Sequence, residues 1–217
     1  MSKPFEYPWD RIKPYKFYRF SMLVSRVMAR VMFKFRVVGR ENLPASASGV
    51  ILVCNHLHSI DPCFLMAATR MRWRFMAKKE LFKNKLVATI FTHSNGFPVD
   101  RETVDRRALD FALAAIREGS YGLGIFPEGT RSPDGFPHEA KAGVAMLARR
   151  TQADILPCAI YHDGKLKFRT RLTVRVGKVI PFEDLGLGEA PNKRQNRAAS
   201  DMIMAEITEL WKQGHEA

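Results

Sequence analysis

The stretch GVILVCNHLHSIDP, residues 49–62, passes from a run of apolar side chains into a polar loop that ends in Asp61 and Pro62. The uninterrupted apolar run at 49–55 is typical of a strand that is buried on both faces of a sheet. Asp61 followed by Pro62 is a common helix start, with the carboxylate as N-cap and the proline at the first helical position. We therefore expect a buried strand, a polar loop and a helix over 62–70, which is the building unit of an α/β sheet.

The rest of the chain continues this alternation of strands and helices. Strands are expected at 74–77, 121–127, 154–161 and 171–176, and helices at 80–92, 102–118, 141–150 and 193–212. The segment at 171–176, RLTVRV, alternates apolar and polar residues and predicts a strand with one wet face. This order predicts an α/β fold, a single domain with a central mixed sheet flanked by helices.

An N-terminal amphipathic helix at the membrane interface is expected to precede this domain, at residues 15–35. At 100° per residue its cations fall within about 80° of one another, and the remaining circumference is mostly apolar. These cations are Lys16, Arg19, Arg26, Arg30 and Lys34. Such a helix suits a membrane interface, where Lys and Arg reach lipid phosphates; a helix packed on the core with its stripe in water is the alternative. The chain accordingly divides into a membrane-associating segment, 1–36, and a domain at 37–217.

The charge of the chain is its one unusual compositional feature. Its 35 Lys and Arg against 22 Asp and Glu give a net charge of +13. This excess indicates a polyanionic partner: an anionic membrane surface, nucleic acid or an acidic carrier protein. The three cysteines form no CxxC pair and favour a reducing compartment. No apolar run is long enough for a transmembrane helix, and no cleavable leader is expected.

The loop after the first buried strand carries residues that could do chemistry. His56 and His58 form an HxH pair, but metallo-hydrolases of the HxHxDH type need an aspartate where this chain has Ile60, so we expect no metal. No GxSxG elbow occurs, and a thiolate at Cys54 would be disfavoured in an apolar strand. A neutral imidazole could instead take a proton from a hydroxyl while a carboxylate holds its other nitrogen. The loop could bring His56 and Asp61 together for this purpose, but a plain strand-end histidine and helix cap fit the spacing equally well.

Two further loops offer groups for an anion. FPEGTRS, at 126–132, follows a predicted strand and combines backbone N–H groups, a hydroxyl and a guanidinium, which suits a phosphate monoester. Lys141, at the start of the next predicted helix, and Arg101, at the end of GFPVDR, are additional cations. Each alone could be a surface charge of a basic protein, and Glu128 could equally form a structural salt bridge or touch the substrate.

Together these blocks closely resemble those of the glycerolipid acyltransferases, in particular the lysophosphatidic acid acyltransferase group. The family's NHxxxxD block is matched at 55–61, its GxxxxR block at 96–101 and its FPEGTRS block, residue for residue, at 126–132. Its apolar block around a proline is matched by ILPCAI at 155–160. The blocks occur in the family's order, and the resemblance runs from about 37 to 179, most of the chain.

The resemblance implies a 1-acyl-sn-glycerol-3-phosphate O-acyltransferase of phospholipid biosynthesis. In this family His56, oriented by Asp61, would deprotonate the sn-2 hydroxyl of lysophosphatidic acid, whose oxygen would attack an acyl thioester without an acyl-enzyme. The donor would be acyl-CoA or an acidic acyl-carrier protein, with no metal and no further cofactor. The acceptor's phosphate would be held by Arg101, Glu128, Gly129, Thr130, Arg131 and Lys141.

The resemblance leaves the acceptor open, because relatives with the same blocks use other lysophospholipids, glycerol 3-phosphate or lyso-aminolipids. His58 stands where the family usually has Ser or Thr, and we expect this difference to bear on acceptor choice rather than on catalysis. The membrane-associating segment predicts a peripheral or monotopic protein on the cytoplasmic face of the cell membrane. A non-catalytic membrane binder is disfavoured by the intact motifs, and a nucleic-acid binder rests on charge alone, without a recognition motif.

Overall fold

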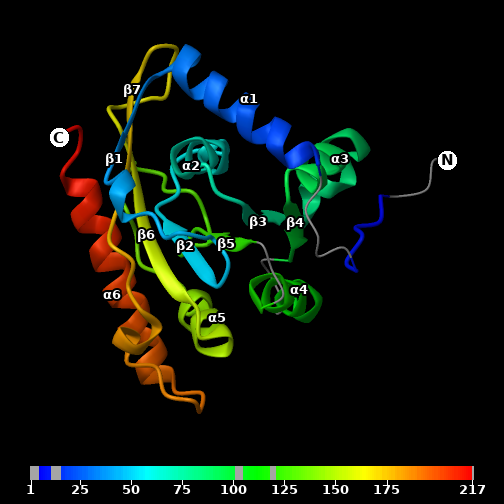
Figure 1. Ribbon diagram of the computed structural model, residues 1–217, viewed down its shortest axis with the longest axis vertical. Coiled ribbons are helices and arrows are strands. Elements are labelled where there is room, and N and C mark those ends of the chain that lie inside the picture. Colours follow the sequence, from blue (N-terminus) through cyan, green and yellow to red (C-terminus); the bar gives the residue numbers. More distant parts are fainter. Residues whose placement is uncertain (1–4, 11–15, 101–104, 118–120, 217) are drawn as a thin grey trace.

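The computed structural model describes residues 5–10, 16–100, 105–117 and 121–216. Within these ranges one mixed sheet of seven strands has the order β1-β7-β6-β2-β5-β3-β4 (Figure 1). The strands are β1 Lys34–Val38, β2 Val50–Cys54, β3 Trp73–Lys78, β4 Gly96–Val99, β5 Gly122–Ile125, β6 Asp154–His162 and β7 Arg171–Val176. Neighbouring strands from β6 to β4 are parallel, β7 is antiparallel to β6, and β1 is parallel to β7. The predicted α/β fold with a central mixed sheet is confirmed.

Helices cover both faces of this sheet (Figure 1). One face carries α1 Phe17–Met32 and α2 Asp61–Thr69, and the other carries α4 Arg106–Arg117, α5 Gly143–Thr151 and α6 Lys193–Lys212. The remaining helix, α3 Lys85–His93, packs beside β4. Because side chains alternate along a strand, β2 sends Leu52 into the core under α1 and α2 and Ile51 into the core on the other face. Both residues are fully buried, which explains why the sequence of this strand is apolar throughout.

Two short strands were not predicted. Lys34–Val38 was assigned in part to the N-terminal helix, but it pairs in parallel with β7 once the chain leaves α1. The sequence predicts a loop over 96–101, yet Gly96–Val99 is the edge strand β4. An edge strand tolerates Pro98, because only one of its sides must supply ladder hydrogen bonds.

The prediction of a wet face on β7 is wrong. Thr173 and Arg175, the polar residues of the alternation, are 1% and 5% exposed. The chain beyond α6 covers them: the Thr173 hydroxyl lies 2.8 Å from His215 Nδ1, and the Arg175 guanidinium donates to the Glu216 carbonyl. Polar side chains can therefore be buried here because the C-terminal segment supplies their partners.

The predicted cap of α2 is also wrong by one residue. Ile60 is the N-cap, Asp61 is the first residue of the helix, and Pro62 follows within the first turn. The Asp61 carboxylate points back into the preceding loop, where it accepts hydrogen bonds from the backbone of Leu57 and His58.

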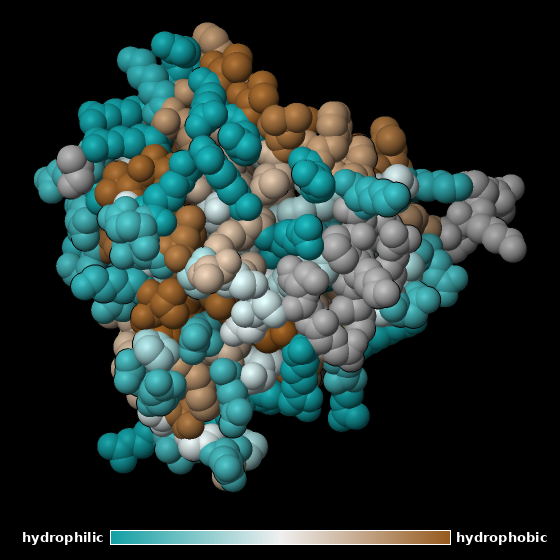
Figure 2. Space-filling view, viewed as in Figure 1, coloured by the Kyte–Doolittle hydropathy of each residue, from teal (hydrophilic) through white to brown (hydrophobic). Residues whose placement is uncertain are grey.

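Helix α1 is shorter than predicted, so Lys16 and Lys34 lie outside it and the cationic stripe on the helix is Arg19, Arg26 and Arg30. Its inner face, with Tyr18 and Ala29, is buried. Its outer surface is exposed and apolar, and Figure 2 shows it as a brown line of residues along the helix. The exposed apolar residues of α1 are Phe17, Phe20, Leu23, Val24, Val27, Val31 and Met32. Among the described residues, none of the helices is both long enough and apolar enough to span a bilayer.

We predict that Leu156→Ala lowers the free energy of unfolding by about 2–5 kcal/mol, because Leu156 of β6 is fully buried and its loss leaves a cavity. Urea denaturation followed by circular dichroism measures the change. The matched control is Leu86→Ala on α3, where the side chain is 71% exposed, and we expect a change within about 0.5 kcal/mol. Equal effects of the two substitutions would contradict the assigned core.

Candidate active site

Asn55 fixes the chain where β2 ends. Its side chain is fully buried, its Nδ2 donates to the Ile160 carbonyl at 3.0 Å, and its Oδ1 accepts the Ile160 N–H at 2.8 Å. The amide thus makes the pair of hydrogen bonds that a backbone peptide would make with β6. These two hydrogen bonds fix the end of β2 against β6, and with it the position of His56, the next residue.

His56 and Asp61 are in direct contact. His56 Nδ1 lies 2.9 Å from Asp61 Oδ2, and the two residues are 7% and 0% exposed. The same oxygen accepts the backbone N–H groups of Leu57 at 2.7 Å and His58 at 2.8 Å. Because the carboxylate is the acceptor in all three contacts, Nδ1 carries the ring hydrogen and Nε2 keeps its lone pair. The pairing that the sequence spacing left open is present in the structure.

The other candidate groups of this loop do not join the pair. The His58 side chain is exposed, and its Nδ1 lies 3.5 Å from the Ser59 hydroxyl. Cys54 is fully buried, and this burial is the main cause that raises the pKa of its thiol well above the usual range. A thiolate at this position is therefore disfavoured, in agreement with the expectation from the sequence.

The FPEGTRS loop, 126–132, holds the main chain of His56 from both sides. Because β5 runs parallel to β2 as its neighbour, this loop leaves the same edge of the sheet. The Glu128 carboxylate accepts the His56 N–H at 3.2 Å, and the Ser132 N–H donates to the His56 carbonyl at 2.7 Å. The Phe126 ring stacks on the imidazole with 4.0 Å between ring centres and 16° between the planes. Both the backbone and the ring of His56 are thus fixed by this one loop.

Glu128 is buried behind the imidazole and is 4% exposed. Burial is the largest influence on its carboxyl and raises its pKa to about 7, although the hydrogen bond from the His56 N–H acts in the opposite direction. Its second oxygen, Oε2, has no hydrogen-bond partner among the described residues. The sequence allowed a salt bridge or a substrate contact for Glu128, whereas in the structure its carboxylate accepts a hydrogen bond from the backbone of His56.

A pocket of about 450 Å³ opens beside His56 on the face of the sheet that carries α4 and α5. Most of its wall is apolar, with polar side chains from His56, Asp100, Asp105 and Lys141. The apolar side chains are Met76, Val99, Ala108, Leu109, Ile125, Phe126, Pro127, Val144, Met146 and Leu147. A pocket with this lining suits a long hydrocarbon chain better than a polar ligand.

Only some of the predicted anion-binding residues line this pocket. Gly129 and Lys141 line the pocket, and Gly129 has a left-handed backbone with φ of 71°, against which the Lys141 side chain packs. Lys141 precedes α5 by two residues instead of starting it. Thr130 and Arg131 are exposed and do not line the pocket. Arg101 lies outside the described residues, although Val99 and Asp100, just before it, reach the pocket.

Sequence reasoning missed the apolar wall of the pocket. The sequence predicts the helices that carry Leu109, Met146 and Leu147, but not that these three side chains line a pocket. Met146 is 36% exposed in a helix whose other apolar side chains are largely buried. Helical periodicity cannot separate a side chain that faces a pocket from one that faces the core, because both lie on the inner side of the helix.

The chain is similar to several known proteins. The chain is 29% identical to 1-acyl-sn-glycerol-3-phosphate acyltransferase of Bacillus subtilis over 197 residues, 89% of this chain and 96% of that protein. It is 28% identical to the Streptococcus pneumoniae protein of the same name over 149 residues, 67% of this chain and 55% of that protein. The crystal structure of the 1-acyl-sn-glycerophosphate (LPA) acyltransferase from Thermotoga maritima has a similar fold, with a TM-score of 0.70 and 23% identity over 89% of this chain and 79% of that one.

A family model described as Acyltransferase matches residues 34–161, more than half of the chain. The matched region contains the loop of His56 and Asp61, the FPEGTRS loop and the strands β2 and β5 from which they leave the sheet. The resemblance drawn from the sequence motifs is confirmed, and the chain belongs to the acyltransferase family.

Proposed function

We propose that the protein is a 1-acyl-sn-glycerol-3-phosphate O-acyltransferase, which transfers an acyl group from a thioester to the sn-2 hydroxyl of lysophosphatidic acid. The observation that carries the mechanism is the contact between the buried Asp61 and Nδ1 of His56, which lines an apolar pocket. The names of the relatives supply the acceptor, since each of them is a 1-acyl-sn-glycerol-3-phosphate acyltransferase.

The reaction needs only a base that later becomes an acid. His56 Nε2 takes the proton of the acceptor hydroxyl, and the oxygen attacks the thioester carbonyl carbon. The tetrahedral species then expels the thiolate as the carbon–sulfur bond breaks, and the imidazolium returns its proton to that sulfur. Asp61 stabilises the imidazolium and holds the ring in the tautomer with a free Nε2. No acyl-enzyme forms, in keeping with the high pKa of the Cys54 thiol.

The pocket beside His56 is proposed to hold the acyl chain of the donor. Its apolar wall from α4 and α5 offers burial to a hydrocarbon chain, and His56 is one of its lining residues. Acyl-CoA and an acidic acyl-carrier protein both remain donors in this proposal. Each presents the same thioester, and each would meet a protein with a net charge of +13.

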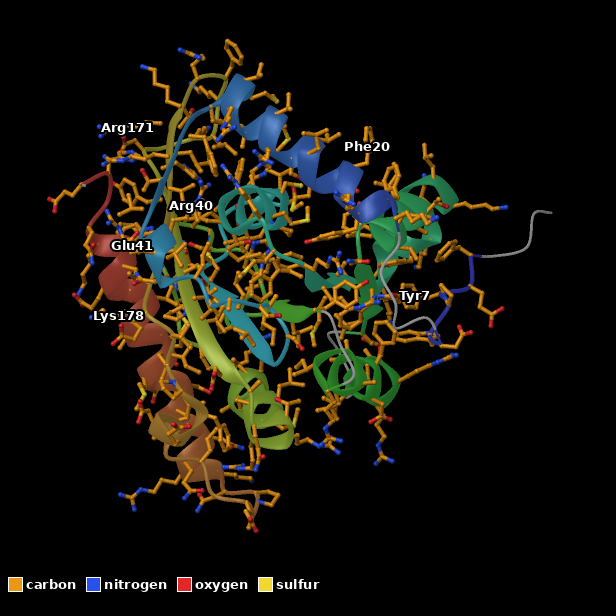
Figure 3. All side chains as sticks on the ribbon, viewed as in Figure 1. Tyr7, Phe20, Arg40, Glu41, Arg171 and Lys178 are labelled. Atoms are coloured by element: carbon orange, nitrogen blue, oxygen red, sulfur yellow. The ribbon has the colours of Figure 1, made fainter. Side chains whose placement is uncertain are left out.

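The acceptor is proposed to arrive from the membrane side. A second apolar pocket, of about 280 Å³, lies between α1, α2 and α3 and includes Ser59 and Pro62 from the catalytic loop region. Phe17 and Phe20 of α1 line it, and Phe20 points away from the body of the molecule (Figure 3). This pocket would take the acceptor's acyl chain, with Lys141 near His56 and the exposed Arg131 and Thr130 available to its phosphate.

Helix α1 is proposed to dock the protein on the membrane surface, as a peripheral or monotopic protein of the cytoplasmic face. Its exposed apolar residues span an arc of roughly 180° at 100° per residue, and its three arginines lie along one side of that arc. A helix with this pattern lies in the membrane interface, with the apolar arc among the acyl chains and the cations among the phosphates.

We propose that Glu128 positions His56 instead of binding the acceptor. Its Oε1 accepts the His56 N–H, and together with Ser132 it fixes the short segment of backbone that carries the imidazole. A glutamine at this position would keep an oxygen that can accept the His56 N–H, without the buried carboxyl group. The two roles can therefore be separated by substitution.

We predict that His56→Ala lowers turnover by about 10²–10⁴-fold, because the base is removed, and that Asp61→Asn causes a comparable loss. Formation of a two-chain phosphatidate from acyl-CoA or acyl-carrier protein and a panel of lyso-lipid acceptors, read by mass spectrometry, measures it. The matched control is His58→Ser, which should keep wild-type turnover and at most shift the preferred acceptor. Loss of activity in His58→Ser with activity retained in His56→Ala would refute the assignment of His56 as the base. If the wild-type enzyme prefers a lyso-aminolipid in the acceptor panel, lysophosphatidic acid is not the acceptor.

We predict that Glu128→Gln changes how the free energy of unfolding depends on pH. The folded pKa of Glu128 is raised from 4.5 to about 7, so the folded state binds the extra proton between these values. Its contribution to stability is present below pH ~4.5 and is lost as the pH rises through about 7. Wild type should therefore lose stability relative to Glu128→Gln between pH 5 and pH 8. Urea denaturation at both values tests this, and parallel curves for the two proteins would contradict it.

We predict that Leu109→Trp shifts the donor preference toward shorter acyl chains, because the larger ring shortens the pocket. In a hydrophobic pocket, each methylene that no longer fits is expected to change the preference by about tenfold or more. Competition between thioesters of different chain length, read from the product by mass spectrometry, measures the shift. Leu81→Trp, at an exposed position outside this pocket, is the control and should leave the preference unchanged.

A further inference from the structure

A small cationic pocket lies between α1, β1 and α2, apart from the candidate active site. Its volume is about 140 Å³, several times the share of ~30 Å³ that a water molecule occupies in the liquid. Three guanidinium groups line it, from Arg26 and Arg30 on α1 and from Arg40. Phe35, Val37 and Ala67 complete the wall. None of these residues was assigned to the binding of a substrate.

The position of Arg40 is set by a tight turn. Gly39, just before it, has a φ of 77°, and a Cβ at that position would lie 2.1 Å from the Val176 carbonyl oxygen. Asn42 donates from Nδ2 to the same oxygen at 2.9 Å, so the turn is fastened to β7. Arg40 Nε then donates to the Ala68 carbonyl near the end of α2 at 3.1 Å. Figure 3 shows Arg40 beside α2, at the β1 side of the sheet.

These cations have no acidic partner in the part of the chain that the structure describes. None of the ion pairs found there includes Arg26, Arg30 or Arg40. Burial lowers the pKa of Arg40, and the charges of Arg70, Arg30 and Arg26 lower it further. Like charges that converge without a carboxylate repel one another, so an anion in the pocket would stabilise the arrangement.

The pocket also lies beside the apolar surface of α1. At 100° per residue, Arg26 and Arg30 fall within about 60° of Leu23, the nearest residue of the exposed apolar arc. Ala67 lies six residues along α2 from Asp61, about 9 Å at 1.5 Å per residue. The two pockets share no lining residue. A group bound among the arginines would thus be at the depth of the lipid headgroups without entering the reaction site.

We infer that Arg26, Arg30 and Arg40 form a binding site for a phosphate group, distinct from the site of acyl transfer. Guanidinium groups bind phosphate through paired, charge-assisted hydrogen bonds, and their planar geometry favours this ligand over a simple point charge. The phosphate can belong to the headgroup of an anionic lipid or to a free phosphate ion. The lipid source rests on the membrane docking proposed for α1, whereas the phosphate chemistry does not.

The test compares two double variants that remove the same charge. Arg26→Gln with Arg30→Gln removes two cations from the pocket, and Lys165→Gln with Lys167→Gln removes two exposed cations outside it and outside the arginine stripe of α1. Binding to vesicles of phosphatidylcholine with phosphatidate is measured by co-sedimentation, with pure phosphatidylcholine vesicles as reference. Binding of inorganic phosphate is measured by calorimetry against chloride at the same ionic strength. Arg26→Lys with Arg30→Lys keeps the charge and should retain more binding than the glutamine pair, and thermal melts confirm folding.

For the lipid source, the pocket variant should bind phosphatidate vesicles at least about tenfold more weakly than the outside variant, because converging charge-assisted bonds are lost. If the ligand is the free ion, wild type and the outside variant should bind inorganic phosphate, and the pocket variant should not. In that case the two variants should bind phosphatidate vesicles equally well. Equal losses in both variants, without selective phosphate binding, would overturn the site and leave only diffuse attraction. Absence of vesicle binding by wild type, with selective phosphate binding retained, would reject the docking of α1 and keep the site.

Discussion

The buried carboxylate of Asp61 is the constraint on which the candidate active site depends. A carboxylate without exposure must be matched by donors, and a single oxygen accepts the His56 ring and two backbone N–H groups. These three contacts dictate the path of the loop between β2 and α2. The imidazole is therefore oriented by the same interactions that allow the charge to be buried.

The parallel pairing of β2 and β5 places a second loop beside His56. Since both strands end at the same edge, the loop after β5 can reach the backbone of His56 with a carboxylate on one side and an amide on the other. On the other side of β2, the hydrogen bonds between the Asn55 side chain and the backbone of β6 fix the residue just before His56. Three adjacent strands thus determine the position of one histidine, as the proposed acyl transfer between two substrates requires.

The sequence could predict those parts of the fold and site that depend on near neighbours in the chain. The buried strand before His56 and the helix that begins near Asp61 follow from one continuous stretch, whereas the spacing of His56 and Asp61 allowed their contact without deciding it. The contact from Glu128 could not be predicted, because it depends on how far the end of β5 extends beside the end of β2. The strand β4 was missed because it is short and contains Gly96 and Pro98, which usually mark turns. The burial of Arg175 depends on the last residues of the chain, which no local pattern connects to β7.

The two apolar pockets lie on opposite faces of the sheet, one under α4 and α5 and the other beneath α1, and Met76 lines both. With α1 on a membrane, one pocket would draw its ligand from lipid and the other from water. The sheet would then act as a partition between two solvents, with His56 at the edge where they meet. Such an arrangement would let a donor carried in water and an acceptor confined to a bilayer react without either leaving its own phase.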